Sequence, residues 1–141
     1  NYNLAPYFYI STTMNDLFVK GDTKSPTLDF KYETATIQVK GRSWPEHALN
    51  VYAPAFAWVD EYKKNPKPIT YIKIGLEYFN TSSSKVVLEL LKRFESMHAE
   101  GKDVRIQWLY EKDDFDLKEE GVTVQESLKI PVELVGVEEF E

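Results

Sequence analysis

Cysteine is absent from the 141 residues, which excludes disulfide bridges, thiolate nucleophiles and cysteine-ligated metal sites. Long apolar runs are also absent, since no stretch approaches the roughly 18 residues of a membrane-spanning helix. A basic excess is missing too: the formal net charge is −6, whereas general nucleic-acid binding requires a basic face. The absence of cysteine is compatible with the cytosol, and the other two absences argue against membranes and nucleic acids as partners.

The composition is that of an ordinary globular domain, with 43% hydrophobic and 28% charged residues. Residues 1–13 are aromatic and apolar, but they lack the basic start and the long apolar core of a signal peptide. We therefore expect an N-terminal extension of unassigned role at 1–13, followed by one domain at 14–141.

Alternating apolar residues predict five strands. The first two, at 27–31 and 35–39, are joined by Glu33 and Thr34 and form an expected hairpin. The other three are expected at 69–79, 103–110 and 131–137.

Three- and four-residue spacing of apolar side chains predicts helices between these strands. The first is expected at 46–64, with Pro54 kinking or splitting it, and the second at 82–100. A third, polar helix is expected to follow the acidic loop 111–116, although Gly121 weakens it. The stripe expected to be buried on the first helix comprises Leu49, Tyr52, Phe56, Val59 and Tyr62, and that on the second comprises Val87, Leu90, Leu91, Phe94 and Met97.

The expected order of elements is β-β-α-β-α-β-α-β. Strand–helix–strand units make right-handed crossovers between parallel strands, and the initial hairpin adds an antiparallel edge. The prediction is a single α/β domain, with a mixed sheet of about five strands and helices mainly on one face. Trp44, Trp58 and Trp108 are expected in or near the core, and an exposed tryptophan would indicate a partner surface.

A run of hydroxyl side chains lies where the third strand is expected to give way to a helix. It occupies Thr81 to Ser84, after Asn80 and before Lys85. The start of a helix has free N–H groups and the positive end of the helix dipole, both of which favour an anion. A hydroxyl in this position can cap the helix, act as a nucleophile or carry a phosphate.

The nucleophile interpretation has weak support. Ser82 and Lys85 fit an S-x-x-K pattern, but the companion motifs of serine acyl-transferases are missing. Of the two histidines, His98 is expected over 20 Å from Ser82, at about 1.5 Å per helical residue. The aspartates of 113–116 do not match a calcium loop, and no glycine-rich nucleotide loop is present, so we expect neither metal nor cofactor. Gly75, in mid-strand, indicates a bulge or a close approach instead.

Several longer motifs resemble one protein family, the SiaC-type regulatory phosphoproteins. The central motif is L-E-Y-F-N-T-S-S-S-K at 76–85. The segments 23–30 and 41–46 resemble the start of the family sequence, and 100–104 with 108–110 resemble its later part. The resemblance spans about residues 17–134.

This resemblance implies a STAS-like domain without enzymatic activity. In the family, a partner kinase phosphorylates the threonine of the N-T-S-S-S motif and a metal-dependent serine/threonine phosphatase removes the phosphate. The unphosphorylated namesake binds and activates a diguanylate cyclase, which links it to cyclic di-GMP and biofilm control. Carried over, the phosphoacceptor is Thr81, and the surrounding partner-binding surface comprises Asn80, Thr81, Ser82, Ser83, Ser84 and Lys85.

The hypothesis is therefore a cytoplasmic, phosphorylation-switched binding protein. Two alternatives stay open at this point. One is a constitutive protein-interaction domain whose serine run only caps a helix. The other is a small serine hydrolase or transferase that uses Ser82, or Thr81, with Lys85.

Overall fold

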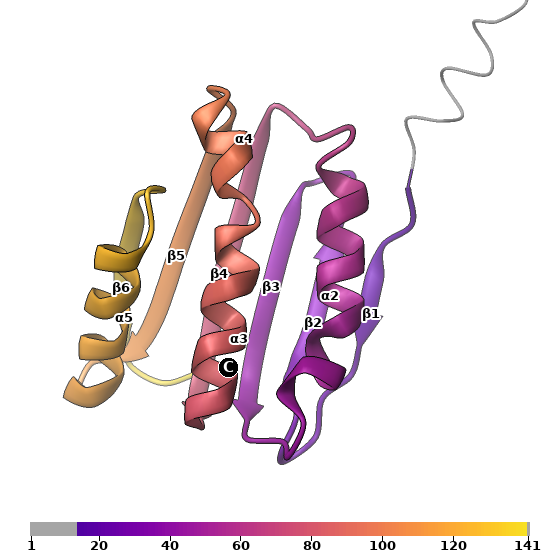
Figure 1. The fold of residues 1–141 in the computed structure, drawn as a ribbon. Coiled ribbons are helices and arrows are strands. Elements are labelled where there is room, and N and C mark those ends of the chain that lie inside the picture. Colours follow the sequence, from indigo (N-terminus) through magenta and orange to yellow (C-terminus); the bar gives the residue numbers. More distant parts are fainter. Residues whose placement is uncertain (1–13, 141) are drawn as a thin grey trace, which may run out of the picture.

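A single six-stranded sheet runs through the computed structural model, which describes residues 14–140 (Figure 1). Its strands are β1 (Leu17–Val19), β2 (Thr27–Lys31), β3 (Thr36–Ser43), β4 (Ile69–Phe79), β5 (Asp103–Glu111) and β6 (Val132–Val137). They lie side by side in chain order. Strands β1 to β3 pair antiparallel, whereas β3 to β6 pair parallel. The extension expected at 1–13 lies outside the described residues.

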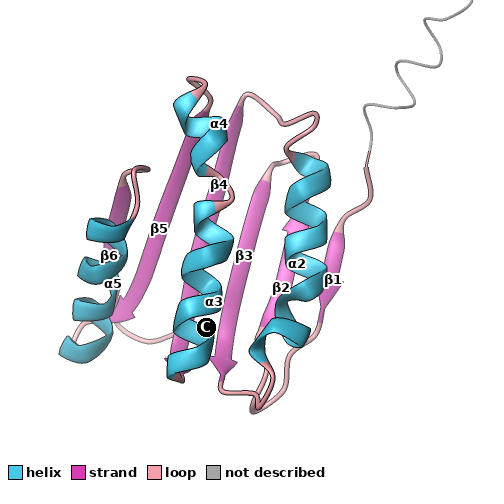
Figure 2. Cartoon of the chain, in the orientation of Figure 1, coloured by secondary structure: helices cyan, strands magenta, loops and turns pink. Residues whose placement is uncertain are grey.

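The helices cover one face of this sheet (Figure 2). They are α2 (Ala48–Tyr62), α3 (Thr81–Lys92), α4 (Glu95–Ala99) and α5 (Phe115–Ser127). The strand order explains the one-sided cover. Each crossover from β3 onward moves one position in the same direction, so right-handed connections place every crossover helix on the same face. The predicted mixed α/β fold, with helices on one face, is confirmed.

Three details differ from the sequence-based expectation. The short edge strand β1 makes a sixth strand. Ala35 belongs to the hairpin turn rather than to β3, because its φ of 53° places it in the left-handed region. The helix expected at 82–100 is divided into α3 and α4 at Arg93 and Phe94, an arrangement in which both Phe94 and Met97 are buried.

Helix α2 continues through Pro54 rather than splitting there. The proline lies on the exposed side of the helix, as does Asn50, whose carbonyl loses its helical N–H partner. The solvent can satisfy that carbonyl, which explains why the helix tolerates the proline. One residue of the expected stripe is misplaced: Leu49 is 69% exposed, whereas Tyr52, Val59 and Tyr62 are fully buried.

The core lies between the sheet and this helical layer. All five expected positions of the second helix are buried there, together with Trp58 and Trp108. Trp44 is not, since it is 38% exposed, and Tyr78 at the end of β4 is 49% exposed. On the opposite face of the sheet, the Phe140 ring lies 3.7 Å from the position that a Cβ on Gly75 would occupy. A Cβ at that distance would make an ordinary van der Waals contact, so the structure shows no close approach that requires glycine at position 75.

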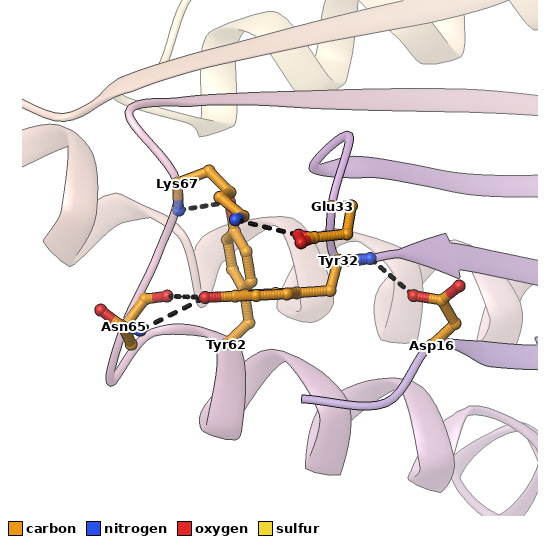
Figure 3. A network of polar contacts seen from close by, with 6 residues as sticks. All are labelled: Asp16, Tyr32, Glu33, Tyr62, Asn65 and Lys67. Carbon is orange, nitrogen blue, oxygen red and sulfur yellow. Dashed lines mark hydrogen bonds and ion pairs between the residues drawn. The ribbon is translucent and has the colours of Figure 1, made fainter. Parts of the chain in front are cut away.

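A polar network joins the β2–β3 turn to the connection between α2 and β4 (Figure 3). The Tyr32 hydroxyl donates to the Asn65 carbonyl at 3.0 Å, and the Lys67 N–H donates to the Tyr62 hydroxyl at 3.1 Å. This network lies at the edge where β4 begins, opposite to the edge where α3 begins. None of the helices within residues 14–140 has the length and apolar character needed to cross a membrane.

Candidate functional site

The hydroxyl run lies at the edge of the sheet where the parallel strands end and the helices begin. Strand β4 ends at Phe79 and α3 begins at Thr81, so Asn80 alone connects them. Asn80 is the N-cap of α3: its Oδ1 accepts the Ser83 N–H at 2.9 Å. Its Nδ2 donates to the Pro45 carbonyl at 3.3 Å, which ties the helix start to the connection between β3 and α2. The expected capping role is thus filled by Asn80.

Thr81 is the first residue of α3, and its side chain is exposed. Within residues 14–140, no group accepts a hydrogen bond from the Thr81 or Ser82 N–H, and the first turn of α3 contains no acidic residue. Both N–H groups, together with the helix dipole, therefore favour negative charge at this point. The Thr81 hydroxyl lies where an added phosphate would be electrostatically stabilised.

The structure divides the other residues of the expected binding surface into two groups. Ser82 and Lys85 are exposed, and the Ser82 hydroxyl donates to Asn80 Oδ1 at 3.3 Å. Asn80 and Ser84 are half-buried. Ser83 is fully buried, so its side chain contacts the interior of the protein and is not available to a partner.

Ser83 belongs to a buried chain of three hydroxyl groups. The Tyr52 hydroxyl donates to Ser43 Oγ at 2.9 Å, and Ser43 Oγ donates to Ser83 Oγ at 2.8 Å. All three residues have no exposed surface. Burial raises the pKa of Tyr52 to about 12, while its hydrogen bond to Ser43 opposes that rise. Tyr52 is therefore a neutral hydrogen-bond donor at physiological pH.

Sequence reasoning missed the contributions of Ser43 and Tyr52 to this site. Tyr52 fits the apolar stripe of its helix, and Ser43 follows the hairpin as an ordinary polar residue. No local signal relates either of them to Ser83, which lies 40 residues from Ser43 along the chain. Only the parallel pairing of β3 and β4 brings these residues together.

The connection between β3 and α2 flanks the start of α3. The Ser43 carbonyl accepts the Asn80 N–H at 2.9 Å, which adds a backbone link to the Pro45 contact. Trp44, between these two residues, is exposed, and the Lys24 ammonium lies 5.1 Å from its ring centroid. Together with Leu49 on the first turn of α2, Trp44 adds apolar surface to this edge.

The other candidate sites have structural roles. The Ser82 hydroxyl interacts with the cap and Lys85 is exposed, so this pair shows no arrangement of nucleophile and base. In the acidic loop, Asp114 caps α5, because its Oδ1 accepts the Leu117 N–H at 3.0 Å. Among residues 14–140, no group of three or more histidine or acidic side chains is placed to hold a metal ion.

Comparison with known proteins identifies relatives of this chain. The model of the SiaC family of regulatory phosphoproteins matches residues 19–137. An uncharacterized protein of Pseudomonas aeruginosa strain UCBPP-PA14 is 25% identical over 99 residues, which cover 70% of this chain and 79% of that protein.

Solved structures of SiaC share the fold. The apo-SiaC crystal structure from Pseudomonas aeruginosa superposes with a TM-score of 0.79 at 22% identity, covering 87% of this chain and all of SiaC. A chain in the crystal structure of the diguanylate cyclase SiaD in complex with its activator SiaC, also from Pseudomonas aeruginosa, gives a TM-score of 0.81 at 22% identity, covering 86% of this chain and all of the matched chain. The family match extends over most of the sequence, and the chain therefore belongs to the SiaC family of regulatory phosphoproteins.

Proposed function

We propose that Thr81 is reversibly phosphorylated and that its phosphate switches binding to a partner protein. The observation that carries this proposal is the position of Thr81: an exposed hydroxyl on the first residue of a helix whose first two N–H groups, those of Thr81 and Ser82, have no acceptor among residues 14–140. A phosphate adds about 1.5 to 2 negative charges at neutral pH, and this helix end stabilises them without rearrangement. Phosphorylation would therefore change the surface and leave the fold intact.

The surface around Thr81 is suited to a charge-sensitive contact. Trp44 and Leu49 offer apolar area on one flank, and Ser82 and Lys85 offer polar groups beside the switch residue. Trp44 is an exposed tryptophan of the kind expected on such a partner surface. A partner that covers this area would have to desolvate a phosphate on Thr81, which is costly unless the phosphate is paired. Unphosphorylated protein binds, and phosphorylated protein is released.

Membership of the SiaC family supports a proposal for the partner proteins as well. SiaC is an activator of the diguanylate cyclase SiaD, so we infer that the output partner of this chain is also a diguanylate cyclase. In this proposal the chain is a cytoplasmic, non-enzymatic regulator that acts through residues 14–141, with 1–13 as an extension. A protein kinase adds the phosphate, a metal-dependent serine/threonine phosphatase removes it, and cyclic di-GMP and biofilm formation respond.

The first test is intact mass and peptide mapping of the protein purified from its native host. A single phosphate on Thr81 at partial occupancy is expected. The second test compares the proteins recovered from host lysate by wild type, Thr81→Ala and Thr81→Asp. We expect Thr81→Ala to retain the partners of the unmodified protein and Thr81→Asp to bind them at least tenfold more weakly, a loss of about 1.4 kcal/mol or more.

Thr123→Asp is the matched control, because it adds the same charge to an exposed threonine on α5, outside the proposed surface. It should bind like wild type. Equal recovery by all four proteins, with no phosphate under several growth conditions, would instead identify a constitutive interaction domain.

A further inference from the structure

We infer that Tyr52 is a positioning residue for the switch: through Ser43 and Ser83 it fixes the first turn of α3, which carries Thr81. The inference rests on the proposed function only for the role of Thr81, since the positioning itself concerns the unmodified chain. Tyr52 does not contact Thr81. It acts through hydroxyl groups that are fully buried beneath the helix start.

The hydrogen bonds of the three buried hydroxyl groups run in one direction. Tyr52 donates to Ser43, and Ser43 donates onward to Ser83. When the Tyr52 hydroxyl is removed, the Ser43 oxygen no longer accepts a hydrogen bond, and water cannot replace the lost donor because the site is buried. The Ser43 hydroxyl then lacks the donor that polarises it, so the hydrogen bond that it donates to Ser83 is weakened. Buried polar chains behave cooperatively for this reason.

Ser43 also contacts the other side of the helix start. Its backbone carbonyl accepts the Asn80 N–H, while its side chain binds Ser83. Asn80 in turn caps the Ser83 N–H. The three residues enclose the turn on which Thr81 and Ser82 are exposed, so a displacement of Ser43 acts on both ends of that turn.

The same helix supplies a matched control in Tyr62. Tyr62 is also fully buried, and its hydroxyl lies 2.7 Å from Thr70 Oγ1 and accepts the Lys67 N–H (Figure 3). These contacts lie at the opposite edge of the sheet, where β4 begins. Tyr62→Phe therefore removes at least as many buried hydrogen bonds as Tyr52→Phe, from the same kind of side chain, without affecting the start of α3.

Amide hydrogen exchange on the purified, unmodified chain tests the inference. In Tyr52→Phe, we expect the protection of the Ser83 and Ser84 N–H groups to fall about tenfold relative to that of the β4 amides. In Tyr62→Phe, this ratio should stay at its wild-type value. An unchanged ratio in Tyr52→Phe, or an equal fall in both variants, would overturn the inference.

A double-mutant cycle gives a second test. It measures the coupling between two residues, which a general loss of stability does not change. Tyr52 and Ser83 are linked through Ser43, so the effects of Tyr52→Phe and Ser83→Ala on the unfolding equilibrium constant should deviate from additivity by about twofold or more. The effects of Tyr62→Phe and Ser83→Ala should combine additively. Additivity in both cycles would overturn the inference. Neither experiment uses the kinase or the partner, so their outcome is separate from the test of Thr81 phosphorylation.

Discussion

Among single residues, Tyr52 combines a fully buried ring with a hydroxyl that can ionise. Burial raises its pKa to about 12 in the folded chain, whereas the pKa of an unfolded tyrosine is about 10. Below pH 10 both states hold the proton, and the contribution of the group to stability is fully present. Between about pH 10 and 12 the unfolded state loses its proton first, so the free energy of unfolding falls as the pH rises.

The expected loss from this one group is about 2 kcal/mol by pH 11.5. Urea unfolding at a series of pH values from 8 to 11.5 measures it. Tyr52→Phe should be less stable at pH 8, because it lacks the hydrogen bond to Ser43, but its stability should fall less steeply above pH 10. Parallel curves for the variant and wild type would show that Tyr52 does not hold its proton in the folded state.

At the scale of elements, α5 shows how one glycine sets the distance between a helix and the sheet. A Cβ on Gly121 would lie 2.6 Å from Trp108 Cδ1 and 2.7 Å from Leu134 Cδ2. The Trp108 ring has little freedom to move, since its Nε1 donates to the Leu117 carbonyl at 3.1 Å. Gly121 lowers the helix propensity of α5, as expected from the sequence. Its lack of a side chain, however, permits α5 to pack closely on β5 and β6.

We therefore expect Gly121→Ala to destabilise the protein, although alanine is the better helix former by about 1 kcal/mol. Because a Cβ would lie only 2.6 Å and 2.7 Å from its neighbours, the overpacking cost should fall in the upper part of the usual range of about 1 to 3 kcal/mol, which leaves a net loss of about 1 to 2 kcal/mol in urea unfolding. Thr123→Ala, on the exposed face of the same helix, should change stability by less than about 0.5 kcal/mol. A Gly121→Ala variant more stable than wild type would mean that α5 can move away from the sheet without cost.

The elements themselves were largely predictable from the sequence, because alternation and helical spacing report directly on one-sided burial. The exceptions have physical reasons. Strand β1 has three residues, too few for a periodic signal, and the break between α3 and α4 contains neither glycine nor proline. Trp44 and Leu49 are apolar but exposed, and spacing alone cannot detect exposure. At the site, the helix start and its cap were foreseeable, whereas the Tyr52–Ser43–Ser83 chain required the pairing of distant strands.

At the scale of the whole molecule, the topology separates the switch from the core. Strands β3, β4 and β5 end at the edge where α2, α3 and α5 begin, so the exposed first turn of α3 lies at the rim of the helical layer. The core side chains lie between the layers and away from Thr81. Charge added at Thr81 is therefore expected to alter what the rim binds and not how the layers pack.

This separation predicts the stability of Thr81→Asp, which changes the formal net charge from −6 to −7 by replacing one neutral side chain with one carboxylate. The carboxylate lies at the positive end of α3, so the free energy of unfolding should stay unchanged or rise by up to about 1 kcal/mol. Thr123→Asp is the matched control. It makes the same exposed substitution near the negative end of α5, where it should lower stability by a comparable amount. Thermal and urea unfolding at low ionic strength measure both variants. If Thr81→Asp were the more destabilised of the two, negative charge at Thr81 would disturb the fold, and its loss of partner binding would reflect unfolding of the helix start instead of a changed surface.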